Sequence, residues 1–157
     1  MKKRMLFFFI FLSITSLLLS ESLNDFYKIV DFNITLKELD NFMAEGKESS
    51  INGLLILDGT VASKSIINQE ETDFLAEIEL VNGEWVGLEA VKMYKCIVRL
   101  AGPDFFARIP QRRTQDQVKN EIVENTHVLV IGKLIDARNL SGQRIPVVQG
   151  YFIRNIQ

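Results

Sequence analysis

The order of the secondary-structure signals in the last hundred residues constrains the fold of this chain most strongly. Apolar residues first recur at strand spacing over residues 54–65, where Gly59 marks a place at which a barrel strand can bend. Residues 127–135 form a nearly continuous apolar run, which is typical of a central strand buried on both faces. Residues 145–153 give the last strand signal. This pattern predicts a mainly β domain.

Two hairpins and one helix are expected between these strands. Asn82-Gly83 is a strong turn signal, so the chain is expected to turn there and to return from Trp85. A second hairpin is expected within residues 96–109, and residues 115–125 have the spacing of a helix. Because this gives one hairpin more than a minimal barrel needs, residues 74–91 are either an insertion or part of the barrel.

A short amphipathic helix is expected before the barrel, over residues 36–45. Thr35 and Glu38 have the spacing of a capping box, and Gly46 suits the position just after the helix. The apolar positions of this segment fall on one face, which either packs on the barrel or serves as a free docking surface. The helix belongs to an N-terminal extension, residues 23–50, and the barrel is expected over residues 51–157.

The first 22 residues have the pattern of a secretory signal peptide. Basic residues at positions 2–4 precede an apolar run of roughly 15 residues, whereas a membrane span needs about 20. Small residues at Ser20 and Ser22 predict cleavage after Ser22, and an uncleaved anchor is the alternative. The single cysteine, Cys96, cannot form an internal disulfide and lies far from the predicted cleavage site. The sequence therefore predicts a periplasmic or otherwise exported protein without a lipid anchor.

The closing segments carry a resemblance to a known family. The glycine within Val130-Ile131-Gly132-Lys133, the run from Pro146 to Tyr151 and the helix before them resemble bacterial OB-fold domains. Within that group the pattern is similar to small exported OB-fold proteins and to the anticodon-binding-like family. The resemblance implies an OB-like Greek-key barrel of five to six strands, with a helix between strands 3 and 4 in addition to the short N-terminal helix.

OB-folds usually bind their ligands on the face of strands two and three, beside the loop that joins strands four and five. Carried over by position, this face is expected over residues 94–110. Basic side chains interleaved with aromatic rings suit a phosphate backbone and its bases. Trp85, expected near a barrel rim, either anchors a partner or covers the core. The candidate binding residues are Trp85, Arg99, Phe105, Phe106, Arg108, Arg112, Arg113, Arg138 and Arg144.

The charge distribution supports a second interpretation of these arginines. Residues 23–90 contain 4 basic and 14 acidic side chains, and residues 91–157 contain 11 basic and 5 acidic ones. The arginines of the second half can therefore pair with the acidic first half of the same chain. Phe105 and Phe106 are expected on opposite faces of one strand, so that at least one of them belongs to the core.

The residue types needed for catalysis are scarce. The chain has one histidine, His127, and one cysteine, and it lacks the spacings of a phosphate-binding loop or a zinc site. Glu77 and Glu79 are expected on one solvated strand face. We therefore expect no enzyme activity, no cofactor and no metal.

The sequence predicts an exported, noncatalytic OB-fold module that binds or assembles with an envelope protein. The alternative is an OB-fold protein that binds an oligonucleotide or another polyanion, such as an anionic glycan, through the basic face. Contact with a membrane is expected only through an uncleaved signal.

Overall fold

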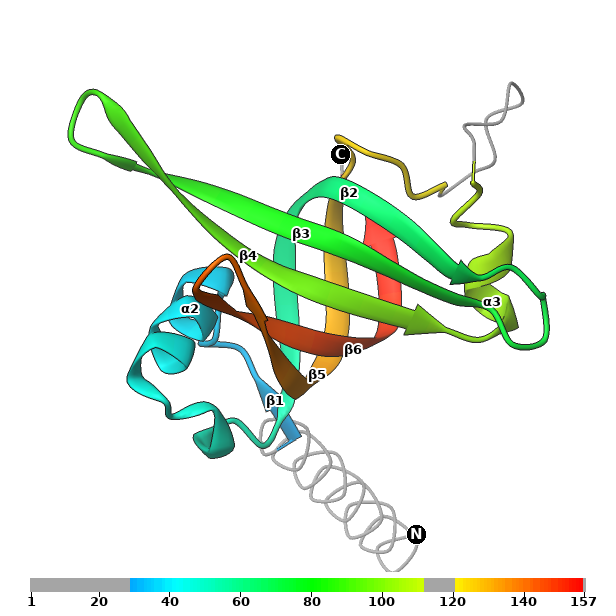
Figure 1. Ribbon diagram of the computed structural model, residues 1–157, viewed down its shortest axis with the longest axis horizontal. Coiled ribbons are helices and arrows are strands. Elements are labelled where there is room, and N and C mark those ends of the chain that lie inside the picture. The colour runs from blue at the N-terminus through cyan, green and yellow to red at the C-terminus, as the bar shows by residue number, and fades with distance from the viewer. Residues whose placement is uncertain (1–28, 112–120, 157) are drawn as a thin grey trace, which may run out of the picture.

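The computed structural model describes residues 29–111 and 121–156 (Figure 1). Strands dominate this part of the chain, and two short helices and one 3-10 turn accompany them. The elements in chain order are β1 (Val30–Asp31), α2 (Leu36–Glu45), η1 (Glu48–Ser50), β2 (Leu54–Asn68), β3 (Leu75–Val86), β4 (Ala90–Ala101), α3 (Pro103–Phe106), β5 (His127–Leu140) and β6 (Gln143–Asn155).

The strands β2 to β6 close into a barrel. Hydrogen-bonded neighbours follow the order β2, β3, β4, β6 and β5, and β5 pairs with β2 to complete the ring. The contact between β4 and β6 is parallel, whereas the other pairs of the ring are antiparallel. These five strands thus have the order of an OB-fold, and α3 lies between its third and fourth strands. The predicted fold class is confirmed.

The core lies inside this ring and draws on every strand. Alternate residues along a strand point to opposite faces, so each strand sends every second side chain inward. Leu39, from α2, is also fully buried against this core. One inward residue from each barrel strand is Leu57, Ile78, Val98, Val130 and Ile153, all at most 1% exposed.

The helix α2 begins and ends as its sequence predicts. The Thr35 hydroxyl accepts a hydrogen bond from the Glu38 amide, and the Thr35 amide donates to the Glu38 carboxylate. Gly46 ends the helix in the left-handed conformation, with φ of 66°. The apolar face of α2 is buried against the barrel, which answers the question of whether it packs or stays free.

The turn predicted at Asn82-Gly83 is wrong. β3 continues to Val86, and Asn82 and Gly83 lie opposite Tyr94 and Met93 of β4 within one long hairpin. The chain reverses over residues 87–89, where Gly87 supplies a positive φ of 68°. The β3–β4 hairpin is therefore part of the barrel, and its far end projects well beyond it (Figure 1).

The second predicted hairpin is also wrong. Residues 105–109 do not return as a strand, because β6 occupies the position beside β4. Instead, Gly102 with φ of 110° and Pro103 at the first helical position begin the short helix α3. Most of the helix predicted over residues 115–125 lies outside the described residues, and residues 121–125 are not helical.

The strand β5 is buried on one face only, unlike the prediction. Val128 and Val130 point into the core, whereas Leu129 and Ile131 are partly exposed on the outer face of the barrel. The apolar run is continuous because this outer face is itself apolar. The predicted signal peptide lies outside the described residues. Within residues 29–111 and 121–156, no helix has the length and hydropathy of a membrane span.

Candidate interaction surfaces of the barrel

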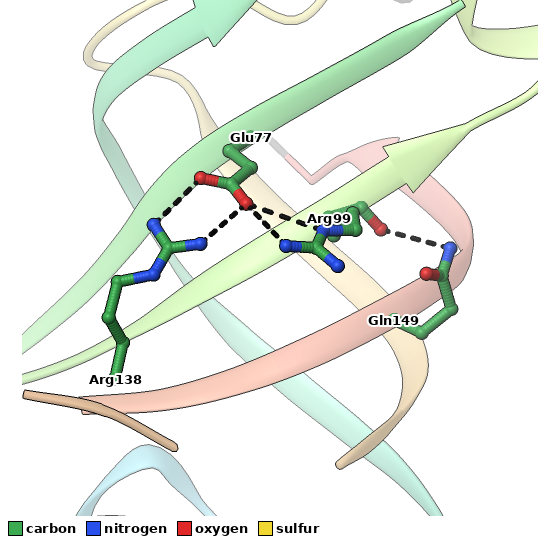
Figure 2. Close-up of polar contacts among 4 residues, drawn as sticks. All are labelled: Glu77, Arg99, Arg138 and Gln149. Carbon is green, nitrogen blue, oxygen red and sulfur yellow. Dashed lines mark hydrogen bonds and ion pairs between the residues drawn. The ribbon is translucent and has the colours of Figure 1, made fainter. Parts of the chain in front are cut away.

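Two of the candidate arginines meet at one carboxylate (Figure 2). Arg138 of β5 donates two hydrogen bonds to Glu77 of β3, with Nη1–Oε2 and Nη2–Oε1 distances of 3.0 and 2.9 Å. Arg99 lies directly opposite Glu77 on β4, and its Nη2 is 3.0 Å from Glu77 Oε1. The Gln149 side chain in turn donates to the Arg99 carbonyl at 3.2 Å. We call Glu77, Arg99 and Arg138 the arginine clamp.

The arginine clamp reduces the positive charge that these two residues present at the surface. Glu77 is only 13% exposed, while the side chains of Arg99 and Arg138 are 35% and 39% exposed. The hydrogen bonds from Arg138, followed by those from Arg99, lower the pKa of Glu77 against the opposing effect of its burial. The single carboxylate of Glu77 offsets one of the two positive charges, and the clamp joins β5 to the β3–β4 sheet.

The other described arginines of the candidate set also have partners in the chain. Arg144 Nη2 lies 2.5 Å from Glu48 Oε1, at one side of an open groove of about 370 Å³ between η1 and β5. Arg108 donates to the carbonyl of Ile153, and burial lowers its pKa. Arg112 and Arg113 lie outside the described residues.

The candidate aromatic residues near α3 are not gathered into a stacking surface. Phe105 is buried in the core, whereas Phe106 is 40% exposed and packs edge-to-face against Phe74, with ring centroids 5.8 Å apart. Strands two and three of the barrel are β3 and β4, so the predicted range 94–110 covers only half of the expected face. The candidates within residues 29–111 and 121–156 therefore do not form one continuous basic and aromatic surface.

Trp85, in contrast, lies on an exposed apolar surface. It is 71% exposed near the end of the β3–β4 hairpin and pairs directly with Val91, while Gly83 pairs with Met93. Residues directly opposite each other, and those two apart, share one face of a two-stranded ribbon. We call this surface the hairpin face; its large members are Trp85, Val91 and Met93, with Leu88, 97% exposed, in the adjoining turn.

The absence of a side chain at Gly83 leaves room for the side chains of the hairpin face. A Cβ at Gly83 would approach Met93 Sδ and Val91 Cγ1 to 3.1 Å, which is a tight contact. The sequence signal for the hairpin face is the spacing of two between Trp85 and Gly83 and between Val91 and Met93. Sequence reasoning missed it because a turn placed at Asn82-Gly83 separates these residues.

The opposite face of the same hairpin is mostly polar and contacts α2. Lys37 Nζ lies 2.8 Å from Glu84 Oε2, and the Tyr94 hydroxyl donates to the same carboxylate oxygen at 2.9 Å. Lys92 pairs with Asp40 at 3.6 Å and lies over the Tyr94 ring. Ion pairs this exposed stabilise little individually, but together they fix which face of the hairpin meets α2. The hairpin face is the one left toward solvent.

A second apolar surface crosses three strands on the outside of the barrel. Ile56, Ile131 and Phe152 lie opposite one another on β2, β5 and β6, and we call them the outer row. Ile56 and Ile131 are partly buried, whereas Phe152 is 45% exposed. A register shift beside Ile131 turns Tyr151 outward as well, at 57% exposure.

The single cysteine and the single histidine lie on different strands, Cys96 on β4 and His127 on β5. Cys96 is fully buried, and this burial raises the pKa of its thiol. His127 Nδ1 lies 3.4 Å from the Thr60 hydroxyl and His127 Nε2 lies 3.8 Å from Asp58 Oδ2 on the surface. Across the part of the chain that the structure describes, no three His, Cys, Asp or Glu side chains are grouped so as to hold a metal ion.

Comparisons with known proteins add a distant structural likeness. No family model matches this sequence, and no curated protein matches it. Among solved structures, the chain is similar to the small single-stranded DNA-binding protein from Streptomyces coelicolor. The two share 10% identity over 66% of this chain and 91% of that chain, with a TM-score of 0.38. The OB-like assignment therefore depends on the strand order of the barrel. The narrower likeness to exported or anticodon-binding-like OB-folds stays a prediction.

Proposed function

We propose that this chain is an exported, noncatalytic OB-fold module that binds an envelope protein through the hairpin face. The observation that carries this proposal is the difference between the two sides of the β3–β4 hairpin. One side is held against α2 by ion pairs, and the other presents Trp85, Val91 and Met93 to solvent. An apolar surface with an exposed tryptophan has the composition of a protein-binding anchor.

The balance of charges supports a protein partner over a polyanion. Arg99 and Arg138 share the Glu77 carboxylate and Arg144 pairs with Glu48, so two of these three positive charges are offset within the chain. A polyanion-binding surface needs cations whose counterions are released when phosphates bind. Cations already paired with internal carboxylates do not supply this release. The apolar surface of the hairpin face needs no such exchange, because its burial is favourable in itself.

Binding of an oligonucleotide or another polyanion is the second candidate function. Its support comes from Lys133 and Arg154, which flank the outer row and make no ion pair within residues 29–111 and 121–156. Exposed aromatic rings at Tyr151 and Phe152 lie on the same surface and suit base stacking. This function would give binding that weakens steeply with salt and is lost when Lys133 and Arg154 are both changed to glutamine.

Trp85→Ala should weaken binding of the envelope partner by about tenfold or more, because an exposed aromatic anchor dominates such a contact. The partner would be trapped by a photo-crosslinking residue at position 88, identified, purified and titrated against both forms of the module. Ile67→Ala is the matched control, since Ile67 is also exposed, at 54%, but lies at the end of β2. Equal affinities of Trp85→Ala and the original chain would contradict the proposal.

Export is tested separately from binding. The first residue of the protein recovered from cells should be Leu23 or a close neighbour. The protein should be found in the soluble envelope fraction rather than in the membrane fraction. Edman sequencing of the purified protein and fractionation of the cells measure these two properties. A cytosolic protein that keeps Met1 would contradict the envelope location in the proposed function. It would not contradict protein binding through the hairpin face.

A further inference from the structure

We propose that this protein assembles head to tail, with the hairpin face and turn of one copy seated on the outer row of the next. This inference rests on the proposed role of the hairpin face as a protein-binding surface and names a second copy as the partner. Both halves of the contact are present in one chain. They are the apolar end of the β3–β4 hairpin and the row Ile56, Ile131 and Phe152.

The shapes and positions of the two surfaces exclude a contact within one copy. The hairpin extends away from the barrel (Figure 1). Its polar side contacts α2 through the ion pairs of Lys37 and Lys92. The outer row lies on the barrel wall itself, across β2, β5 and β6. A hairpin fixed in this direction cannot fold back onto its own wall, so only another copy can bring the two surfaces together.

Charges of opposite sign lie beside the two surfaces, although Asp58 adds one acid to the barrel wall in the cross-strand row of Arg154. Glu89 in the hairpin turn is exposed and, among the described residues, has no ion-pair partner. Lys133 and Arg154, one on each side of the outer row, are the exposed cations that lack a carboxylate partner in the same part of the chain. Opposite charges around matched apolar centres favour the docked orientation and disfavour contacts between two like surfaces.

Because the two surfaces differ, the contact is heterologous. A docked pair leaves one hairpin face and one outer row free, so assembly continues as an open chain unless its rotation closes a ring. The exposed apolar area at each surface is limited to a few side chains, which predicts a weak, concentration-dependent association rather than a permanent dimer.

Sedimentation velocity of the purified protein over the micromolar range tests this proposal, together with the emission of Trp85, the single tryptophan. The original chain should show rising mass and a blue-shifted Trp85 emission with concentration. Leu88→Gln removes an apolar side chain from the turn, and Phe152→Gln removes one from the outer row. Each variant alone should stay monomeric, but their mixture should form a one-to-one dimer, because one intact surface of each kind remains.

The mixture separates the proposed contact from other forms of association. Ile67→Gln serves as the control for loss of an exposed apolar side chain and should assemble like the original chain. Arg154→Gln, a surface change, should weaken assembly even if Phe152→Gln fails to fold. A monomeric original chain at high concentration overturns the proposal, and so does association that Leu88→Gln and Phe152→Gln leave intact. A monomer that still binds an envelope protein through Trp85 would overturn self-assembly without affecting the proposed function.

Discussion

Leu57→Ala should lower the free energy of unfolding by about 2–5 kcal/mol, the usual range for truncating a buried leucine. Leu57 has no exposed surface and lies opposite Val130, where β2 and β5 close the barrel. Its removal leaves a cavity inside a ring of strands that cannot easily collapse. Denaturant unfolding followed by circular dichroism measures the change.

The same strand provides the control for this prediction. Ile67 also belongs to β2 but is 54% exposed, so Ile67→Ala should change the free energy of unfolding by no more than about 0.5 kcal/mol. If the two variants unfolded at the same denaturant concentration, the closure between β2 and β5 would not be the centre of the core.

Glu77→Gln should destabilise the protein by about 1–3 kcal/mol at neutral pH, because it removes the charge that both arginines of the clamp share. Arg99 and Arg138 are partly exposed, so water compensates for some of the lost contact. Glu79→Gln is the matched control on the same strand face. The ion pair between Glu79 and Lys95 is long, at 3.7 Å, and lies on the surface. Its loss should therefore cost at most about 1 kcal/mol.

The effect of Glu77 should depend on pH in a defined direction. The arginines lower the pKa of Glu77 in the folded protein. Its carboxylate therefore stays ionised to a lower pH in the folded state than in the unfolded state. The resulting stabilisation is complete above the ordinary glutamate pKa of about 4.3 and is lost as the pH falls through the folded pKa. The stability difference between the original chain and Glu77→Gln should therefore shrink on acidification. A difference that grows toward low pH would contradict the role of the clamp.

The barrel could be predicted from the sequence because inward and outward residues alternate along most of each strand. The predicted turn at Asn82-Gly83 and the predicted burial of β5 were wrong because each local signal fits two structures. Asn82-Gly83 suits a tight turn, but it also fits inside a strand, and Gly87 five residues after Asn82 provides the actual reversal. The apolar run of β5 suggested burial on both faces, whereas half of its side chains form a partly exposed outer surface.

The candidate site shows the same limit of sequence reasoning. A sequence reveals the charge of Arg99, Arg138 and Arg144 but not the partner that each side chain reaches in the fold. The alternative interpretation, in which arginines of the second half pair with acids of the first half, describes Arg99 and Arg138 at Glu77 and Arg144 at Glu48. Glu77 itself was expected to be solvated, because strand alternation does not indicate that Arg138 crosses over from β5.

Closure of the barrel between β2 and β5 also has a kinetic consequence. The residues that complete the ring, such as Leu57 and Val130, are far apart in the chain, and loops of this length close slowly. Because the chain is synthesised from its N-terminus, β2 cannot pair with β5 until β5 has been made. During that interval the open edge and apolar inner face of β2 to β4 are exposed to other chains. A protein of this topology spends its most aggregation-prone moments late in synthesis, just before its last two strands arrive.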